Sequence, residues 1–209
     1  MGCGIGSDAA AIAAGGANVT AFDLSAVSVA LTQRRFKEYD LDGDFMVGDA
    51  EHLPFRNNSY DYVMSIGVLH HTPDTAKAVS ELYRVLRSRG KALVMLYYSD
   101  SFRYRVVFRI LTIMGKRRID DLVAEYDGKG NPLGKVFSKA EAEKMFSRFG
   151  KVNMRVYNFH AYDIARLFEN FSSHLTRLVA RIVRRIPRFC YDAISKIIGL
   201  DLYIFAVKD

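Results

Sequence analysis

The stretch Gly2-Cys3-Gly4-Ile5-Gly6 decides the fold, and the small residues after it predict a helix over 7–14. Glycines at alternate positions let the backbone turn sharply and come close to a ligand, because no side chain intervenes. The helix that follows points its first N–H groups towards whatever is bound. Such a turn follows the first strand of a nucleotide-type α/β fold and faces the ligand crevice. The stretch therefore predicts an α/β fold with a ligand site at this loop.

An acidic residue, Asp23, closes the expected strand 18–23 and lies 17 residues after Gly6. A ribose-binding carboxylate belongs at about this distance in nucleotide-binding folds. Dinucleotide-binding loops carry a further glycine or alanine where this chain has Ser7. This difference weakens the case for an NAD enzyme without excluding one.

Expected strands and helices alternate along the first hundred residues. The strands are expected at 18–23, 44–48, 60–66 and 91–98, and the helices at 25–39 and 74–87. The last of these strands is almost continuously apolar, as in a central parallel strand that is covered on both faces. This order predicts a doubly wound, Rossmann-like sheet. Two further strands are expected at 151–159 and 201–208, with a mostly helical insertion at about 160–199 between them.

The composition is that of one globular domain over residues 1–209, with half of the residues hydrophobic and a quarter charged. No uncharged apolar run reaches the ~18–20 residues of a membrane span, and no basic region followed by an apolar run indicates a secretory signal. The two cysteines, Cys3 and Cys190, form no disulfide or metal pattern, which fits a reducing cytoplasm. We therefore expect a cytoplasmic protein without a metal site.

Charge is unevenly distributed along the chain. Residues 1–100 hold nine Lys and Arg against twelve Asp and Glu, whereas residues 101–209 hold twenty-one against eleven. The basic second half suggests an anionic partner, either a membrane surface or a nucleic acid. Apolar residues follow helical spacing over 175–186, with arginines on the opposite side. This pattern is typical of a helix packed on the sheet or, as a sharper hypothesis, of a helix lying on an anionic membrane.

Taken together, these motifs resemble the class I S-adenosylmethionine-dependent methyltransferases, in the small-molecule and quinone-type group. The resemblance lies mostly in residues 1–98, where its pieces occur in order: the loop Gly2–Gly6, Asp23 before Leu24-Ser25, the loop Gly48–Phe55, the strand Tyr60–Val63 leading to Val68-Leu69-His70-His71, and the turn at 86–91. It implies a Rossmann-like sheet that ends in an antiparallel hairpin, and S-adenosylmethionine as the cofactor.

The resemblance also assigns site residues. The glycine loop would cradle the methionine part of the cofactor, Asp23 would bind the ribose hydroxyls, and Asp49 would contact the exocyclic amine of the adenine. The implied cofactor-binding set is Gly2, Gly4, Gly6, Asp23, Leu24, Asp49 and Ala50. His70 and His71 follow the strand that ends at the active site and are the candidate catalytic bases. The alternative is that the pair only shapes its loop.

One piece of the family pattern falls outside the sequence. In the family, a strand that ends in an acidic residue precedes the glycine loop, and here it would lie before Met1. We expect a misassigned start or a fragment, because everything downstream keeps the pattern. Without that strand the sheet loses a central member and exposes unpaired edges.

The expected function is methyl transfer to a small or lipid-like acceptor, with residues 1–100 as the cofactor-binding half and 101–209 as the acceptor-side half. Two alternatives stay open. One is an NAD-dependent reductase or epimerase, although its usual Tyr-x-x-x-Lys pair is absent, and the other is a non-catalytic cofactor-binding fragment. Ile66-Gly67-Val68-Leu69 stands where nucleic-acid amino methyltransferases have Asn/Asp-Pro-Pro-Tyr. A nucleic-acid substrate is therefore not expected.

Overall fold

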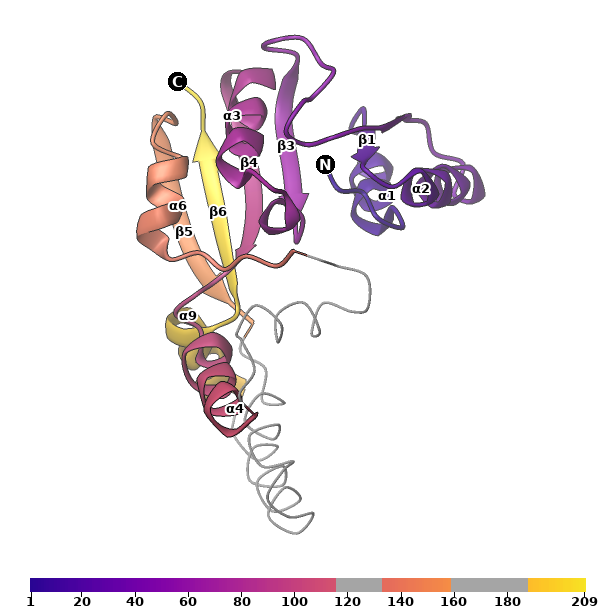
Figure 1. Cartoon of the computed structure of the whole chain (residues 1–209). Helices are drawn as coiled ribbons and strands as arrows, with labels where there is room; N and C mark the ends of the chain where they lie inside the picture. The colour runs from indigo at the N-terminus through magenta and orange to yellow at the C-terminus, as the bar shows by residue number, and fades with distance from the viewer. Residues whose placement is uncertain (116–132, 159–187) are drawn as a thin grey trace. The chain divides into compact units, whose positions relative to one another are not determined.

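The structure is a computed structural model that describes residues 1–115, 133–158 and 188–209 (Figure 1). The chain forms two compact units. Unit 1 comprises Met1–Val94, Met145–Lys151 and Ala206–Asp209, and unit 2 comprises Met95–Lys144 and Val152–Phe205. The amphipathic helix predicted at 175–186 lies outside the described residues. The assignment of the whole chain to a single domain remains a prediction.

Most of unit 1 follows the predicted alternation of strands and helices. Its elements in chain order are α1 (Ser7–Ala14), β1 (Thr20–Asp23), α2 (Ala26–Glu38), β2 (Asp44–Val47), β3 (Tyr60–Ile66), the short 3₁₀ helix η1 (Leu69–His71), α3 (Thr75–Val85) and the first part of β4 (Leu86–Tyr97).

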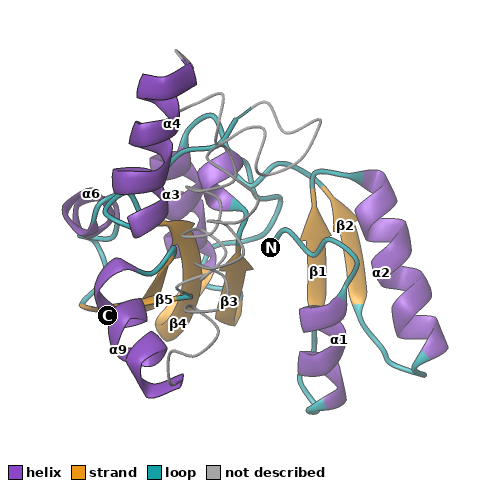
Figure 2. Cartoon of the chain, turned by 90° about the horizontal axis from the view of Figure 1, so that it is seen from below, coloured by secondary structure: helices purple, strands orange, loops and turns teal. Residues whose placement is uncertain are grey.

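The first two strands form a sheet of their own. Strands β1 and β2 pair in parallel, with Thr20 opposite Asp44 and Asp23 opposite Val47. Helices α1 and α2 lie beside this sheet (Figure 2). Ser25 caps α2, because its hydroxyl accepts a hydrogen bond from the N–H of the residue three positions later at 3.2 Å.

The second sheet has the strand order β3-β4-β6-β5, in which β5 is Lys151–Tyr157 and β6 is Asp201–Val207. The backbone of Arg89 pairs with that of Lys208, and the N–H of Tyr98 donates to Leu200. As the residue numbers rise along β4 they fall along β6, so these strands are antiparallel. The Rossmann-like α/β fold and its antiparallel ending are thus confirmed, although the strands divide into two sheets.

The core of unit 1 lies under α3 and around the second sheet. Helix α3 turns one face inward, on which Ala78, Val79, Leu82 and Val85 are buried. A hydrophobic cluster of Phe22, Leu53 and Val85 continues this core towards β1. The amphipathic spacing of α3 therefore fixes the helix on the sheet through one apolar face.

Unit 2 holds the end of β4 and a set of short helices. They are the π-helix η2 (Arg103–Val107), α4 (Phe108–Gly115), α6 (Lys139–Met145, of which the last residue belongs to unit 1) and α9 (Arg188–Ile198). Ser138 and Glu141 form a capping box at the start of α6, because their side chains accept each other's backbone N–H groups at 3.2 and 2.8 Å. No helix within the described ranges has the length and hydropathy needed to span a membrane.

The largest difference from the sequence prediction is the start of β4. A turn was expected at 86–91 and a strand from 91, whereas β4 begins at Leu86. Arg89 N–H donates to Lys208 O, and Lys208 N–H donates to Gly90 O, each at 2.9 Å. Pairing with the end of β6 therefore extends the strand, within which Arg89 has a φ of 62°.

Candidate functional site

The loop before α1 is folded tightly against the end of β1. The N–H groups of Gly2 and Cys3 both donate to the carbonyl oxygen of Phe22, at 2.7 and 3.1 Å. The N–H of Gly6 donates to Cys3 O at 2.8 Å, and α1 begins at the next residue. The loop therefore brings the first turn of α1 to the carboxyl end of β1, as predicted for a ligand-binding turn.

Two positions of this loop require glycine for different reasons. Gly2 has a φ of +71°, and a Cβ there would overlap the side chain of Val68. Gly4 has a φ of +53°, but a Cβ there would meet no atom within 4 Å. Both values lie in the left-handed region that side chains other than hydrogen disfavour. Gly2 thus allows close packing on Val68, whereas a side chain at Gly4 would point into open space.

Asp23 links this loop to the end of β1. One carboxylate oxygen accepts the Gly4 N–H at 2.9 Å, and the other accepts the Ser25 N–H, also at 2.9 Å. Each carboxylate oxygen has a second lone pair. The side chain is therefore held in one orientation while it retains the capacity to accept further hydrogen bonds from a ligand.

The parallel pairing of β1 and β2 brings a second acidic residue to the same edge. Gly48, which follows β2, donates its N–H to Asp23 O at 2.9 Å. Asp49 is the next residue, so both predicted acids lie at the carboxyl ends of adjacent strands. This edge is where open α/β sheets bind ligands. The structure therefore brings Asp23 and Asp49 to the same edge of the first sheet.

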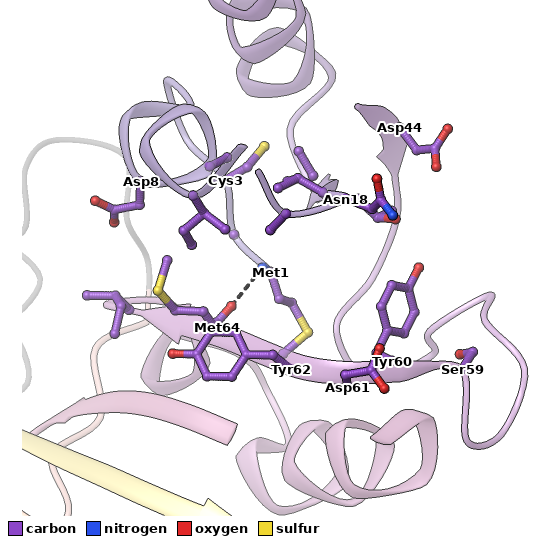
Figure 3. A pocket seen from close by; sticks show the side chains of 18 of the residues that line it. Met1, Cys3, Asp8, Asn18, Asp44, Ser59, Tyr60, Asp61, Tyr62 and Met64 are labelled. Carbon is purple, nitrogen blue, oxygen red and sulfur yellow. Dashed lines mark hydrogen bonds between the residues drawn. The ribbon is translucent and has the colours of Figure 1, made fainter. Parts of the chain in front are cut away.

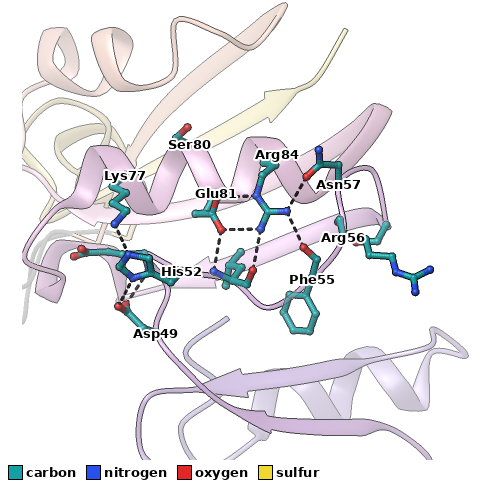
Figure 4. Close-up of polar contacts among 12 residues, drawn as sticks. Asp49, His52, Phe55, Arg56, Asn57, Lys77, Ser80, Glu81 and Arg84 are labelled. Atoms are coloured by element: carbon teal, nitrogen blue, oxygen red, sulfur yellow. Dashed lines mark hydrogen bonds and ion pairs between the residues drawn. The ribbon is translucent and has the colours of Figure 1, made fainter.

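Asp49 is held by its own loop (Figure 4). It accepts the Glu51 N–H at 2.9 Å through one oxygen, and its other oxygen lies 2.9 Å from Nδ1 of His52. Nε2 of His52 in turn contacts Nζ of Lys77 on α3. The hydrogen bond from the Glu51 backbone, followed by that from His52, lowers the pKa of the Asp49 carboxyl. Asp49 therefore presents a negative charge at neutral pH.

An ion pair on α3 fixes the rest of this loop (Figure 4). Arg84 and Glu81 approach to 2.7 Å, and both side chains are largely shielded from solvent. Glu81 accepts the Leu53 N–H at 2.9 Å, while Arg84 donates to the carbonyl oxygens of Leu53 and Phe55 at 2.9 and 2.7 Å. The loop that carries Asp49 is thereby attached to the helix at several points of its backbone.

The two remaining residues of the predicted cofactor set differ in exposure. Leu24 follows Asp23 and is 75% exposed, whereas Ala50 follows Asp49 and is buried. An exposed leucine beside two polar groups offers an apolar surface to a ligand ring. Ala50 is a small residue whose side chain is shielded from solvent.

The predicted catalytic pair lies on η1, after the carboxyl end of β3. The two imidazole rings are 4.1 Å apart between centroids. His70 is completely buried, and burial, reinforced by His71, lowers its pKa to about 3. His71 retains partial exposure. His70 is thus a neutral interior side chain, and His71 is the member of the pair with access to solvent. Val68, two residues before His70, is the residue that packs on Gly2.

Comparison with known proteins assigns the family. Residues 1–94 match the family model described as "Methyltransferase domain". The chain is 31% identical over 160 residues to phosphoethanolamine N-methyltransferase 2 of Caenorhabditis elegans, which covers 73% of this chain and 35% of the relative. It is 39% identical over 85 residues to phthiotriol/phenolphthiotriol dimycocerosates methyltransferase 1 of Mycobacterium ulcerans (strain Agy99), which covers 40% of this chain and 29% of the relative. A solved S-adenosylmethionine-dependent methyltransferase from Methanosarcina mazei has the same fold, with a TM-score of 0.65 at 17% identity over 99% of this chain and 89% of that one.

The chain belongs to the class I S-adenosylmethionine-dependent methyltransferases. It spans about a third of the length of the two curated relatives described above. The methyl donor of this family is S-adenosylmethionine. The roles assigned to individual site residues remain predictions for this methyltransferase.

Sequence reasoning missed the residues that hold the methyltransferase's glycine loop from α2. The Thr32 hydroxyl donates to Gly4 O at 3.1 Å, and Arg35 Nε donates to Ile5 O at 2.7 Å. Both partners are about thirty residues away in sequence. A Cβ on Gly6 would approach the Thr32 side chain to 2.8 Å. No local pattern marks such contacts, because they depend on how α2 packs beside the loop.

Proposed function

We propose that this chain binds S-adenosylmethionine at the carboxyl edge of β1 and β2 and transfers its methyl group to a small or lipid-like acceptor. The observation that carries the proposal is the convergence of the Gly4 backbone, Asp23 and Asp49 on one edge. The family implies the methyl donor, and the geometry of this edge supports its binding here.

The residues at this edge fit the chemistry of the cofactor. The open space beside Gly4 suits close approach of the methionine part, since a Cβ there would meet no atom within 4 Å apart from those of its chain neighbours. Asp23 is oriented by two N–H groups and can accept hydrogen bonds from a diol. The exposed side chain of Leu24 suits contact with a flat ring, and Asp49 is a charged acceptor for an exocyclic amine.

Once bound, the sulfonium of the cofactor supplies a methyl group that is already activated by its positive charge. The chain then has to hold the acceptor in line and, for a hydroxyl or a protonated amine, to remove a proton. Between the two predicted bases we favour His71, because it is partly exposed and follows the end of β3. His70 has a pKa of about 3 and is a weak base, so we assign it a packing role beneath His71.

The acceptor class is proposed from the relatives and from charge. The relatives described above are named for phosphoethanolamine and for phthiotriol dimycocerosates. Residues 101–209 carry twenty-one Lys and Arg against eleven Asp and Glu. Such an excess of positive charge attracts an acceptor that carries a phosphate or another anionic group.

The test is transfer of a radiolabelled methyl group from S-adenosylmethionine to phosphoethanolamine and, separately, to vesicles of phosphatidylethanolamine. The two acceptors share a headgroup chemistry, so the preferred one distinguishes a small from a lipid-like substrate. His71→Asn should reduce the rate by the ~10²–10⁴-fold of a general base, with little change in cofactor affinity. Tight binding of the cofactor without transfer to any amine, hydroxyl or lipid acceptor would favour the non-catalytic alternative.

A further inference from the structure

A relay of three side chains holds the carboxylate of Asp49 (Figure 4). Oδ2 of Asp49 lies 2.9 Å from Nδ1 of His52, and Nε2 of His52 contacts Nζ of Lys77 on α3. Neither His52 nor Lys77 belongs to the cofactor-binding set that the sequence predicts. Their contact joins residues 25 positions apart, so it depends on the packing of the loop against the helix.

The chemistry of the two end groups fixes the direction of the hydrogen bonds in this relay. The ammonium group of Lys77 can only donate, so Nε2 of His52 accepts. A neutral imidazole carries a single N–H, which then lies on Nδ1 and donates to the carboxylate of Asp49. Both ends of the relay thus require the same tautomer of His52, and hydrogen bonds in such a chain strengthen one another.

Two further hydrogen bonds attach the loop of His52 to the first turn of α3. The side chain of Glu51, which precedes His52, is buried and accepts the N–H of Asp74 at 2.6 Å. The side chain of Asp74 in turn accepts the N–H of Lys77 at 3.0 Å and caps the helix. The backbones that carry His52 and Lys77 are therefore already positioned, so only the two side chains have to be ordered.

The relay leaves the carboxylate of Asp49 accessible as a hydrogen-bond acceptor. One of its oxygens accepts the Glu51 N–H and the other accepts the His52 N–H, both at 2.9 Å. Each oxygen keeps one further lone pair, and the side chain is 47% exposed. The backbone hydrogen bond from Glu51, followed by that from His52, lowers the pKa of the carboxyl, so the group stays ionised at neutral pH. A ligand that reaches Asp49 therefore meets acceptors alone.

We propose that His52 and Lys77 are positioning residues for ligand binding: Lys77 fixes the Nδ1–H tautomer of His52, and His52 fixes the carboxylate of Asp49. The site then prefers a ring that carries an amino group over the same ring with a carbonyl at that position, because the carbonyl would face a second acceptor. A lysine on α3 thereby contributes to affinity through two other side chains. The proposal rests on the proposed function, since it takes Asp49 to contact the ring of the cofactor.

The relay is separate from a cavity of about 610 Å³ that residues of β1 and β3 line (Figure 3). None of Asp49, His52 and Lys77 lines this cavity, whereas the exposed Asp44, at the start of β2, does. Asp44 is therefore a matched acid on the strand that leads to Asp49. Lys37, which is exposed in the last turn of α2, is a matched lysine. Neutral variants of these two residues control for the loss of a charge outside the relay.

The first measurement is the tautomer of His52. Long-range nitrogen–proton NMR spectra distinguish an imidazole that carries its proton on Nδ1 from one that carries it on Nε2, and His52→Asn identifies the signal by its loss. The relay predicts the Nδ1–H tautomer at neutral pH. The Nε2–H tautomer, or a ring protonated on both nitrogens, would overturn the proposal.

The second measurement is calorimetric titration of S-adenosylhomocysteine and of S-inosylhomocysteine, in which a carbonyl replaces the amino group of the ring. The starting chain should bind the amino ligand about 10–100-fold more tightly, as expected for a hydrogen bond to a charged group. Asp49→Asn offers a donor as well as an acceptor and should reduce this preference to about threefold or less, while Asp44→Asn should leave it unchanged. A preference that survives Asp49→Asn would overturn the proposed selectivity.

Lys77→Met tests the relay itself. It should weaken the binding of S-adenosylhomocysteine by about three- to tenfold, whereas Lys37→Met should not change it. The amide nitrogen of asparagine can take the place of Nδ1 and donate to Asp49 without help from Lys77. In the His52→Asn background, Lys77→Met should therefore have no effect on affinity. Equal losses in the two backgrounds would show that Lys77 acts on Asp49 through its charge alone and would overturn the relay.

The same titrations separate the relay from the proposed function. Binding of S-adenosylhomocysteine that does not respond to Lys77→Met would overturn the relay and leave the proposed function intact. No binding by the folded starting chain would overturn both. Weaker binding in Lys77→Met that His52→Asn restores would support the relay, because a purely structural role of Lys77 would not depend on which side chain occupies position 52.

Discussion

Gly2→Ala and Gly4→Ala should affect different properties, although both glycines belong to one loop. The first should mainly lower stability, and the second should mainly lower the affinity for the cofactor. At Gly2, the new Cβ meets Val68 and the backbone has a φ of +71°. A left-handed alanine costs roughly 1–2 kcal/mol, and forcing a methyl group into a packed site costs about 1–3 kcal/mol more. Gly2→Ala should therefore lower the free energy of unfolding by about 3 kcal/mol.

At Gly4 only the first of these costs applies, since a Cβ there meets no protein atom. Gly4→Ala should lower the free energy of unfolding by about 1 kcal/mol. Its methyl group would, however, occupy the open space assigned to the cofactor. The affinity for S-adenosylhomocysteine should therefore fall by about tenfold or more, which corresponds to ~1.4 kcal/mol of binding free energy.

Urea unfolding followed by circular dichroism measures the first quantity, and calorimetric titration measures the second. Val68→Ala removes the group that Gly2→Ala would meet, so the double variant should recover part of the lost stability. Equal losses of stability in the two single variants, or unaltered binding by Gly4→Ala, would refute the division of roles between these glycines.

Two further predictions concern groups around the site. Between pH 6.5 and 3 the unfolded chain binds a proton at His70 that the folded chain does not, so stability should fall as the pH decreases through this window. At pH 4.5 the loss in the free energy of unfolding is about 3 kcal/mol. Urea titrations at several pH values should show this decrease in stability in the starting chain and in His71→Gln but not in His70→Gln. An unchanged pH dependence of stability in His70→Gln would contradict the burial of His70 as its cause. Arg84→Met removes the donor to two loop carbonyls and the partner of Glu81, so it should cost about 1–3 kcal/mol of stability and speed hydrogen exchange over residues 51–57. Unaltered exchange there would contradict the role of Arg84 as the anchor of this loop.

Local patterns predicted most of the elements of unit 1. The helix expected at 7–14 and the strand expected at 60–66 match α1 and β3, and the helix expected at 25–39 matches α2, which Ser25 caps. These features depend on neighbours in sequence, such as a capping hydroxyl or an apolar alternation. The early start of β4 was not predictable in this way, because it depends on pairing with Lys208 at the far end of the chain.

In the candidate site, too, features that depend on local sequence were predictable and those that depend on distant contacts were not. Asp23 and Asp49 were predictable, since each follows an expected strand and parallel strands bring their carboxyl ends together. The contacts of Thr32 with Gly4 and of Lys77 with His52 were not, since they depend on the packing of α2 and α3 beside the loops. The burial of His70 was likewise invisible in the sequence, where the two histidines look equivalent. The sequence therefore identifies which chemical groups form a site more reliably than it identifies which of them are exposed to solvent.

The central claim is that the edge formed by β1 and β2 binds the cofactor through Asp23. The most direct measurement is calorimetric titration of S-adenosylhomocysteine into this chain, into Asp23→Asn and into Asp42→Asn, an exposed acid outside the site. Loss of charge-assisted hydrogen bonds costs roughly 1.5–3 kcal/mol. We predict binding by the starting chain and by Asp42→Asn, with affinity reduced at least about tenfold in Asp23→Asn. Equal affinity in all three proteins, or no binding by a chain whose circular dichroism is that of a folded protein, would contradict the account.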